Sequence, residues 1–339
     1  MTINLVSDTV TKPTPAMLQA MMAATVGDDV FGEDPTVNAL QEKAARLFGK
    51  EAALFCPSGT MTNQIAIKCH TQPLDEVICD HFSHIYQYEV GGYAYNSGAA
   101  INLIEGTHGK ITAAQVEAAI KPVYDWLPLS RLVVLENTAN KGGGSYYTLE
   151  EVKPISQLCR QRGLKLHLDG ARLFNALVET RETALEWGAP FDSISVCLSK
   201  GLGAPVGSLL IGDEAFIKQA RRVRKVMGGG MRQAGYLAAA GIFALDHHVE
   251  RLKEDNQRAR ILGQTLEVQP WVESVRPVQT NIVIFDLQPP LSAASFLEKL
   301  LAKGIQAAPF GPRTVRFVTH LDFTETMLGT TVEVLKSFA

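Results

Sequence analysis

The sequence predicts an α/β protein: a large domain with a mostly parallel seven-stranded sheet sandwiched by helices, and a smaller C-terminal α+β domain. Between residues 50 and 212, short apolar runs alternate with amphipathic stretches, a pattern typical of strands joined by crossover helices. The remainder combines helices and short strands in a rhythm of its own. Because 339 residues exceed what one hydrophobic core usually serves, we expect two domains, over residues 1–245 and 246–339.

Seven apolar runs are the candidate strands of the large sheet. They are residues 53–56, 76–79, 100–104, 132–135, 164–168, 193–197 and 207–211. Helices are predicted over residues 112–120 and 148–162, where apolar side chains recur at helical spacing. Thr112 and Thr148 are the expected N-caps, and Glu151 completes a capping-box pattern three residues after Thr148.

The C-terminal elements follow a glycine triplet at residues 228–230. A long alanine-rich helix is expected to begin there and to continue past Ala244. The smaller domain is then predicted to contain a helix, a strand at 281–285, a helix at 293–303, short strands at 305–307 and 314–318, and a final helix. The N-terminal segment is assigned to the large domain, where we expect it to contribute to the active site.

Composition and charge argue against a nucleic-acid or membrane partner. The formal net charge is −3, and the one basic run, residues 221–225, is interpreted as the solvated end of a helix. No apolar stretch approaches the ~20 residues of a membrane span, and the first residues lack the pattern of a secretion signal. Five cysteines in apolar contexts indicate thiols in a reducing compartment, so a cytoplasmic location is expected.

Two polar residues, Asp169 and Lys200, are predicted at the carboxyl edge of the sheet, where open α/β sheets bind ligands. Taken alone, Asp169 is equally a helix N-cap and Lys200 equally an exposed turn lysine. Together they are one crossover helix apart and match the needs of pyridoxal 5'-phosphate (PLP). The lysine would form a Schiff base with this cofactor, and the carboxylate would keep its ring nitrogen protonated.

A phosphate site is predicted at residues 56–63, which follow a strand and open a helix. Free backbone N–H groups and the helix dipole attract anions at such a position. A plain capped helix start is the simpler interpretation of this segment alone. Beside Asp169 and Lys200, the phosphate interpretation is preferred.

Two further side chains, His84 and Arg316, are candidates for ligand contacts. His84 is interpreted as an aromatic lid stacked on a planar cofactor, with a buried structural histidine as the alternative. No third ligand accompanies His81 and His84, so no metal site is predicted. Arg316 lies in an apolar strand and needs an anionic partner, which is either a substrate α-carboxylate or a structural salt bridge.

Six sequence blocks resemble those of the low-specificity L-threonine aldolases, which are aspartate-aminotransferase-like (fold type I) PLP enzymes. The resemblance runs nearly end to end. Its blocks are residues 7–14 (SDTVTKPT), 27–35 (GDDVFGEDP), 57–60 (PSGT), 167–172 (HLDGAR), 198–201 (LSKG) and 228–235 (GGGMRQAG).

The resemblance implies a role for each matching position near the cofactor. Lys200 would bind PLP covalently, and Asp169 would contact the pyridine nitrogen. Gly59 and Thr60 would bind the phosphate, while His84 would stack on the ring. Of these residues, Lys200, Asp169 and His84 are the predicted catalytic residues.

The resemblance also implies substrate contacts and shared active sites. Ser7, Arg172 and Arg316 would address the phenolic oxygen of the cofactor or the substrate carboxylate. Lys225 and Arg232 match positions near the cofactor phosphate and would reach it from a neighbouring subunit. A homotetramer built from dimers is therefore expected, with a small amino acid as the substrate.

The implied reaction is retro-aldol cleavage of L-threonine, L-allo-threonine or a related β-hydroxy-α-amino acid to glycine and an aldehyde. Trp126 occupies a position where the family commonly has a histidine, and Ala139 replaces a second one. Tryptophan cannot act as a base, so we expect an altered substrate pocket that includes Trp126, with His84 or a water as the base. The alternatives are a related PLP β-eliminating lyase or an aldolase for aryl or acidic β-hydroxy amino acids.

Overall fold

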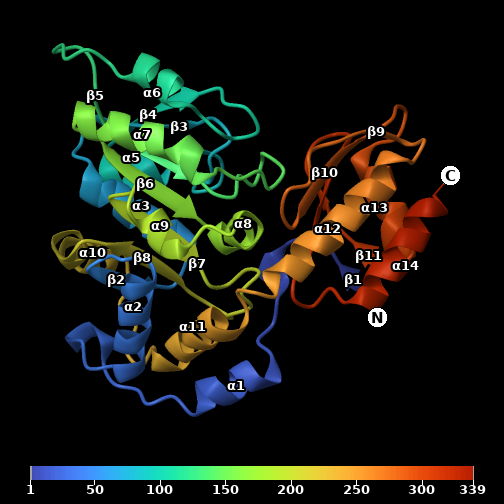
Figure 1. Ribbon diagram of the computed structural model, residues 1–339, viewed down its shortest axis with the longest axis horizontal. Helices are drawn as coiled ribbons and strands as arrows, with labels where there is room; N and C mark the ends of the chain where they lie inside the picture. Colours follow the sequence, from blue (N-terminus) through green and yellow to red (C-terminus); the bar gives the residue numbers. More distant parts are fainter. Residues whose placement is uncertain (1, 339) are drawn as a thin grey trace.

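The computed structural model describes residues 2–338 and has a large and a small lobe (Figure 1). The large lobe is built on one seven-stranded sheet in the order β2-β8-β7-β6-β5-β3-β4. The strands are β2 (Ala52–Cys56), β3 (Asp75–Asp80), β4 (Ala100–Ile104), β5 (Leu129–Glu136), β6 (Lys165–Gly170), β7 (Ser193–Cys197) and β8 (Ser208–Gly212). β8 runs antiparallel to both its neighbours, and the other pairs are parallel. The predicted mostly parallel sheet is confirmed.

Both faces of this sheet are buried, as its strand sequences require. Val133 and Leu135 on β5 pack in one apolar cluster, and the alternating Leu132 and Val134 pack in another on the opposite face. The covering helices are α1 (Pro15–Met22), α2 (Pro35–Leu47), α3 (Gly59–His70), α4 (His84–Gln87), α5 (Gly92–Ser97), α6 (Ala113–Ala119), α7 (Leu149–Arg162), α8 (Leu173–Thr180), α9 (Ala184–Gly188), α10 (Glu214–Val226) and α11 (Gly235–His247).

The smaller lobe contains a four-stranded antiparallel sheet in the order β12-β13-β10-β9. Its strands are β9 (Val272–Val275), β10 (Ile282–Leu287), β12 (Ala308–Pro309) and β13 (Thr314–Val318), and its helices are α12 (Leu252–Glu267), α13 (Ala293–Ala302) and α14 (Glu325–Lys336). α12 begins near the junction of the lobes and runs into the smaller one (Figure 1). The predicted α+β character of this region is confirmed.

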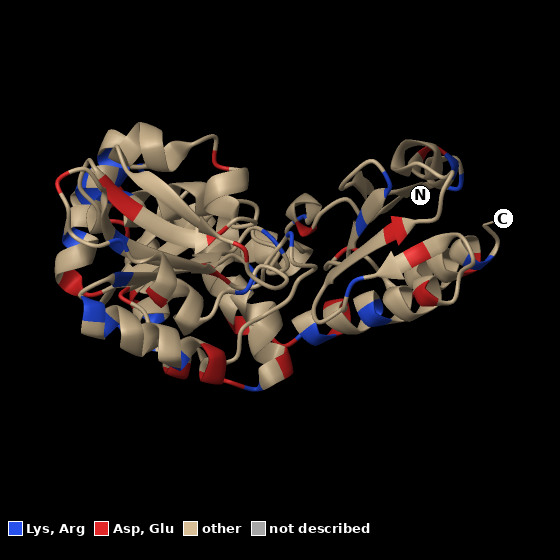
Figure 2. Ribbon diagram, turned by 90° about the horizontal axis from the view of Figure 1, so that it is seen from above, with Lys and Arg blue, Asp and Glu red and all other residues tan. Residues whose placement is uncertain are grey.

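The N-terminal strand packs in the smaller lobe. β1 (Ile3–Asn4) pairs in parallel with β11 (Ile305–Gln306), and Ile3 and Leu5 belong to the apolar core of that lobe. Both chain ends therefore lie on the same lobe, as both views show (Figures 1 and 2). The domain boundary between residues 245 and 246 stays a prediction. Because the N-terminal strand packs in the smaller lobe, the chain also crosses between the lobes after this strand.

Most predicted elements are present, with small shifts at their ends. Thr112 and Thr148 cap α6 and α7, and Thr148 donates its backbone N–H to Glu151 at 2.9 Å. β6 extends to Gly170, so Asp169 lies inside the strand rather than after it. The prediction did not include β1, β9 and β12, which are four residues long or shorter.

Charged residues of both signs are interspersed over both lobes (Figure 2). The basic run at the end of α10 departs from its prediction, because Arg224 is buried and pairs with the buried Asp29 at 2.6 Å. The run is therefore only partly solvated. Within residues 2–338, the helices are too short or too polar to cross a membrane.

Candidate active site

A cavity of about 190 Å³ opens at the carboxyl edge of the sheet, between α3, β6 and the segment after β7. It brings together five of the predicted site residues: Gly59, Thr60, His84, Asp169 and Lys200. The remaining lining residues are Ser58, Asn63, Ala171, Cys197 and Ser199. The edge predicted from strand order is therefore where these side chains meet.

The start of α3 provides a place for an anion. Ser58 caps the helix by accepting a hydrogen bond from the backbone N–H of Met61 at 3.2 Å. The N–H groups of Gly59 and Thr60 precede that bond and belong to the first turn, where intrahelical acceptors are absent. A Cβ on Gly59 would meet Cys197 Sγ at 2.7 Å, so the helix start can pack this closely against β7 only because residue 59 is glycine.

Asp169 is buried at the cavity and held by two donors. Asn63 Nδ2 donates to one carboxylate oxygen at 2.8 Å, and the backbone N–H of Ala171 donates to the other at 3.2 Å. Asn63 also contacts His167 Nε2 through its amide oxygen at 3.1 Å. Asn63 was not predicted, although it lies four residues after Gly59 and therefore on the same face of α3.

His84 is held by a second carboxylate, Glu89. Its Nδ1 lies 2.9 Å from Glu89 Oε1, while Gln64 donates to the other oxygen of Glu89 at 2.6 Å. Burial lowers the pKa of His84, but the hydrogen bond to Glu89 and the charges of Asp169, Glu89 and Glu136 together outweigh burial and raise the pKa above its ordinary value. A ring nitrogen of His84 and one carboxylate oxygen from each of Glu89 and Asp169 lie within 4.8 Å of one another. Asn63 donates a hydrogen bond to both carboxylates.

Glu136, at the end of β5, is a third buried carboxylate near the cavity. It accepts hydrogen bonds from the backbone N–H groups of His84 at 2.7 Å and Asn140 at 2.9 Å. Burial, followed by repulsion from Asp169, raises the pKa of Glu136 to about 7. This residue therefore fixes two backbone segments that border the site.

Lys200 lies in the turn after β7 and faces the cavity. Its carbonyl oxygen accepts a hydrogen bond from Thr11 Oγ1 at 2.9 Å, which ties the N-terminal segment to the turn. Ser7 lies in the same segment and caps a short 3-10 turn, Asp8–Val10. The N-terminal segment, which is expected to contribute to the active site, therefore directly contacts the turn that carries Lys200.

Arg172 forms a buried ion pair with Asp8. Its Nε and Nη2 donate to the two carboxylate oxygens at 2.6 and 2.7 Å, and Asn281 of the smaller lobe donates to one of them at 3.1 Å. Burial favours the neutral carboxyl, but the guanidinium outweighs it and holds the pKa of Asp8 well below its usual range. Asp8 was not predicted, because nothing along the chain links it to Arg172.

Arg316, on β13, is a partly buried cation that lacks a carboxylate partner among the described residues. Its Nη1 donates to Asn140 Oδ1 at 2.8 Å and its Nη2 to the carbonyl of Val6 at 3.0 Å, while Nε is buried without a hydrogen-bond partner among the described residues. Burial, followed by repulsion from Arg172, lowers the pKa of Arg316 to about 10. Of the two interpretations of Arg316, the structural salt bridge is not found within residues 2–338.

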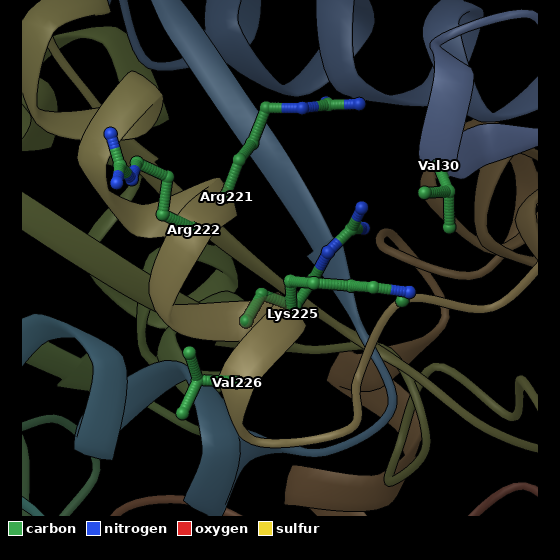
Figure 3. A pocket seen from close by; sticks show the side chains of 7 residues that line it. Val30, Arg221, Arg222, Lys225 and Val226 are labelled. Carbon is green, nitrogen blue, oxygen red and sulfur yellow. The ribbon is translucent and has the colours of Figure 1, made fainter.

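Lys225 and Arg232 lie outside the cavity of Lys200. Lys225 lines a basic cavity of about 400 Å³ together with Val30 and Arg221. Arg221 and Lys225 extend toward the side of Val30, whereas Arg222 points away (Figure 3). Arg232 pairs with Asp28 at 2.8 Å, so within one chain neither residue reaches the candidate phosphate site.

Trp126 also lies elsewhere. Its side chain is 76% exposed, stacks on Tyr124 with ring centroids 4.9 Å apart, and lines a surface cavity with Leu74 and Gly98. The predicted contact between Trp126 and the substrate is therefore not made in the cavity of a single chain.

The residues of the cavity fit PLP. Gly59 and Thr60 place the N–H groups of a helix N-terminus at the cavity for a phosphate, Asp169 is fixed by donors as a buried acceptor, and Lys200 forms no ion pair within the described chain. A buried Asp at the end of one strand and a Lys after the next, on a mostly parallel sheet with a smaller second lobe, define a PLP-dependent enzyme.

Comparisons with known proteins agree with this class. Residues 4–289 match a protein family described as beta-eliminating lyase. The low specificity L-threonine aldolase of Escherichia coli K12 is 44% identical over 330 residues, which are 96% of each chain. A probable low-specificity L-threonine aldolase of Arabidopsis thaliana is 40% identical over 94% of this chain and 92% of the plant protein. The solved threonine aldolase of Leishmania major superposes with a TM-score of 0.84 at 26% identity, over 98% of both chains.

The chain therefore belongs to the beta-eliminating lyase family, among the low-specificity L-threonine aldolases. The expected family is confirmed, and with it a PLP-dependent lyase.

Proposed function

We propose that this enzyme cleaves L-threonine, L-allo-threonine and related β-hydroxy-α-amino acids to glycine and an aldehyde. The observation that carries the proposal is the presence, beside a PLP-type cavity, of Arg316, a partly buried guanidinium without a carboxylate partner in the described chain. A substrate α-carboxylate supplies the missing anion.

Four groups of the cavity would hold the cofactor. Lys200 Nζ would bind it covalently, and Asp169 would accept a hydrogen bond from its ring nitrogen. The amides of Gly59 and Thr60 would hold its phosphate, and His84 would cover its ring. Bound PLP supplies an electron sink for the electron pair released when the Cα–Cβ bond breaks.

The chain's own side chains orient the substrate and move one proton. Arg316 grips the α-carboxylate, which sets the bond at Cα that is cleaved, while the Arg172–Asp8 pair keeps Arg172 in place beside it. His84 takes the β-hydroxyl proton at Nε2, and Glu89 holds Nδ1 and stabilises the charged ring. Arg316 therefore selects the bond, and the His84–Glu89 pair assists its cleavage.

Lys225, Arg232 and Trp126 are assigned to shared sites in a homotetramer. Lys225 and Arg232 would serve the cofactor phosphate of a neighbouring subunit, since neither lines the Lys200 cavity of its own chain. The same assembly would be needed to bring Trp126 to a substrate. All five cysteines are free thiols, which supports a cytoplasmic location.

The proposal is tested on the purified holoenzyme with L-threonine and L-allo-threonine. We expect glycine and acetaldehyde as products and a visible cofactor band that disappears in Lys200→Ala. His84→Phe should keep the band but cleave at least ~10²-fold more slowly, the usual contribution of a proton-transfer group. Release of ammonia and a keto acid instead of glycine would show that the enzyme is a β-eliminating lyase and not an aldolase. An unchanged rate in cofactor-loaded His84→Phe would remove His84 as the base.

A further inference from the structure

Lys141 lies among three aromatic rings where the two lobes meet. Its Nζ is 5.8 Å from the ring centroid of Phe82, 5.6 Å from that of Tyr88 and 6.0 Å from that of Phe310. Phe82 and Tyr88 belong to the large lobe, whereas Phe310 lies between β12 and β13 of the smaller lobe. Three separate segments therefore fix the position of one ammonium group.

One of these rings, that of Tyr88, contacts a residue that lines the cavity. Tyr88 packs with its ring centroid 5.4 Å from that of His84, and His84 lines the same cavity as Lys200. A substrate side chain that leaves the cavity past His84 would therefore meet Tyr88, one of the rings around Lys141.

A second ring joins Lys141 to the carboxylate-binding arginine. The Arg316 guanidinium carbon lies 5.0 Å from the centroid of Phe310, the ring that also contacts Lys141. Asn140, the residue before Lys141, accepts the hydrogen bond from Arg316 Nη1. Lys141 and Arg316 are thus neighbouring cations on one aromatic ring.

Neither of these cations has a counter-charge. Within residues 2–338, no acidic side chain forms an ion pair with Lys141 or Arg316, whereas neighbouring Arg172 is neutralised by Asp8. Aromatic faces attract a cation but leave its charge in place. Two such cations beside one aromatic ring favour a molecule with two anionic groups.

We propose that Lys141 binds a second carboxylate of the substrate, so that the preferred substrates are β-hydroxy-α-amino acids with an acidic group beyond Cβ. This inference rests on the proposed function and narrows its substrate class. Arg316 receives the α-carboxylate and Lys141 the distal one. In the cleavage, the Cα–Cβ bond breaks, the hydroxyl loses its proton and Cβ becomes the carbonyl of an oxo acid. Cα gains a proton to give glycine, so no oxidant or reductant is needed.

The test compares kcat/KM of the holoenzyme for L-3-hydroxyaspartate, L-threonine and L-phenylserine. The wild type is expected to favour 3-hydroxyaspartate over the other two by about tenfold or more, as a charge-assisted bond provides. Lys141→Met keeps the aliphatic stem against the rings and removes the charge. It should lower the ratio of 3-hydroxyaspartate to threonine cleavage by about 10–100-fold, mainly through KM.

Two matched variants separate charge from structure. Lys141→Arg restores a cation among the same rings and should recover most of the ratio. Lys299→Met removes an exposed lysine from α13, far along the chain from the site, and should leave the ratio as in the wild type.

The outcomes distinguish this inference from the function on which it rests. If threonine is cleaved but 3-hydroxyaspartate is not preferred, or if Lys141→Met lowers both rates equally, Lys141 does not bind a second carboxylate and the aldolase proposal stands. If none of the three substrates yields glycine, the aldolase proposal itself fails.

Discussion

Asn63 organises the polar side of the candidate active site. Its amide nitrogen donates to Asp169 at 2.8 Å and to Glu89 at 2.9 Å, and all three side chains are buried. Buried carboxylates are costly unless they accept hydrogen bonds, so one amide group stabilises both the predicted cofactor contact and the partner of His84. The positions of Asp169 and His84 are therefore linked through a residue that touches neither Lys200 nor Arg316 in the described hydrogen bonds.

Glu136 predicts a pH dependence of stability. Its pKa rises from 4.5 to about 7 on folding, so the folded state holds the proton more tightly than the unfolded chain. The contribution of Glu136 is therefore fully present below about pH 4.5 and is lost as the pH rises through about 7. Glu136→Gln should remove this part of the slope in urea unfolding of the enzyme between these pH values. It should also cost ~1–3 kcal/mol, because one backbone N–H loses its acceptor.

The measurement has a clear control. Glu273→Gln alters an exposed carboxylate and should keep the slope of the wild type. If Glu136→Gln shows the same slope as the wild type, Glu136 does not titrate in this range.

Five site residues could be predicted because each lies at or near the end of a strand or the start of a helix, positions where α/β sheets bind ligands. Lys200 and Gly59 follow buried strands, Asp169 lies at the end of one, and the carboxyl ends of parallel strands share one edge. Asp8 and Glu89 could not, because their partners are set by packing between segments that the sequence does not connect. Arg172 illustrates the difference: its position was predicted, and its partner on the N-terminal segment was not.

At the level of elements, the start of α3 is shaped by one close contact. A Cβ on residue 59 would meet Cys197 Sγ at 2.7 Å and Ser208 Oγ at 3.6 Å. Gly59→Ala is therefore expected to shift the helix start away from β7 and to weaken PLP binding at least tenfold, since displaced amides lose their hydrogen bonds to the phosphate. The loss is measured by titrating the apoenzyme with PLP and following the visible band.

A second substitution tests the cause. Cys197→Ala removes the sulfur that the new methyl group meets, so Gly59→Ala with Cys197→Ala should bind PLP more tightly than Gly59→Ala alone. Equal affinity of the single and double variants would show that the contact with Cys197 is not the reason.

Strands and helices with strong periodicity were predictable, and very short ones were not. β7 and β4 have the predicted ends, because short apolar runs between polar segments define a strand. β1 and β12 contain two residues each, too few for a period-two pattern. They exist because a partner strand elsewhere in the chain accepts their hydrogen bonds.

At the scale of the molecule, Asp8 joins both lobes to the N-terminal segment. It pairs with Arg172 of the large lobe and accepts from Asn281 of the smaller one. Asp8→Asn should destabilise the protein by ~3–5 kcal/mol, because it leaves a buried guanidinium without its partner. The depressed pKa of Asp8 means that this stability is present above pH 3.8 and is lost as the pH falls below that value.

Urea unfolding at neutral pH measures this loss. Glu273→Gln breaks an exposed pair with Arg313 and should cost less than ~1 kcal/mol. A loss of the same small size in Asp8→Asn would mean that the buried pair does not hold the lobes together.

The pairing of β1 with β11 sets an order of events during synthesis. Ile3 is synthesised well before its partner Ile305, with the whole large lobe between them. The large lobe can fold as it emerges, since domains generally fold as units. The segment that carries Ser7 and Asp8 must wait until β11 has been made. A nascent chain cut short before β11 would therefore contain the lysine and lack the means to complete the pocket around it.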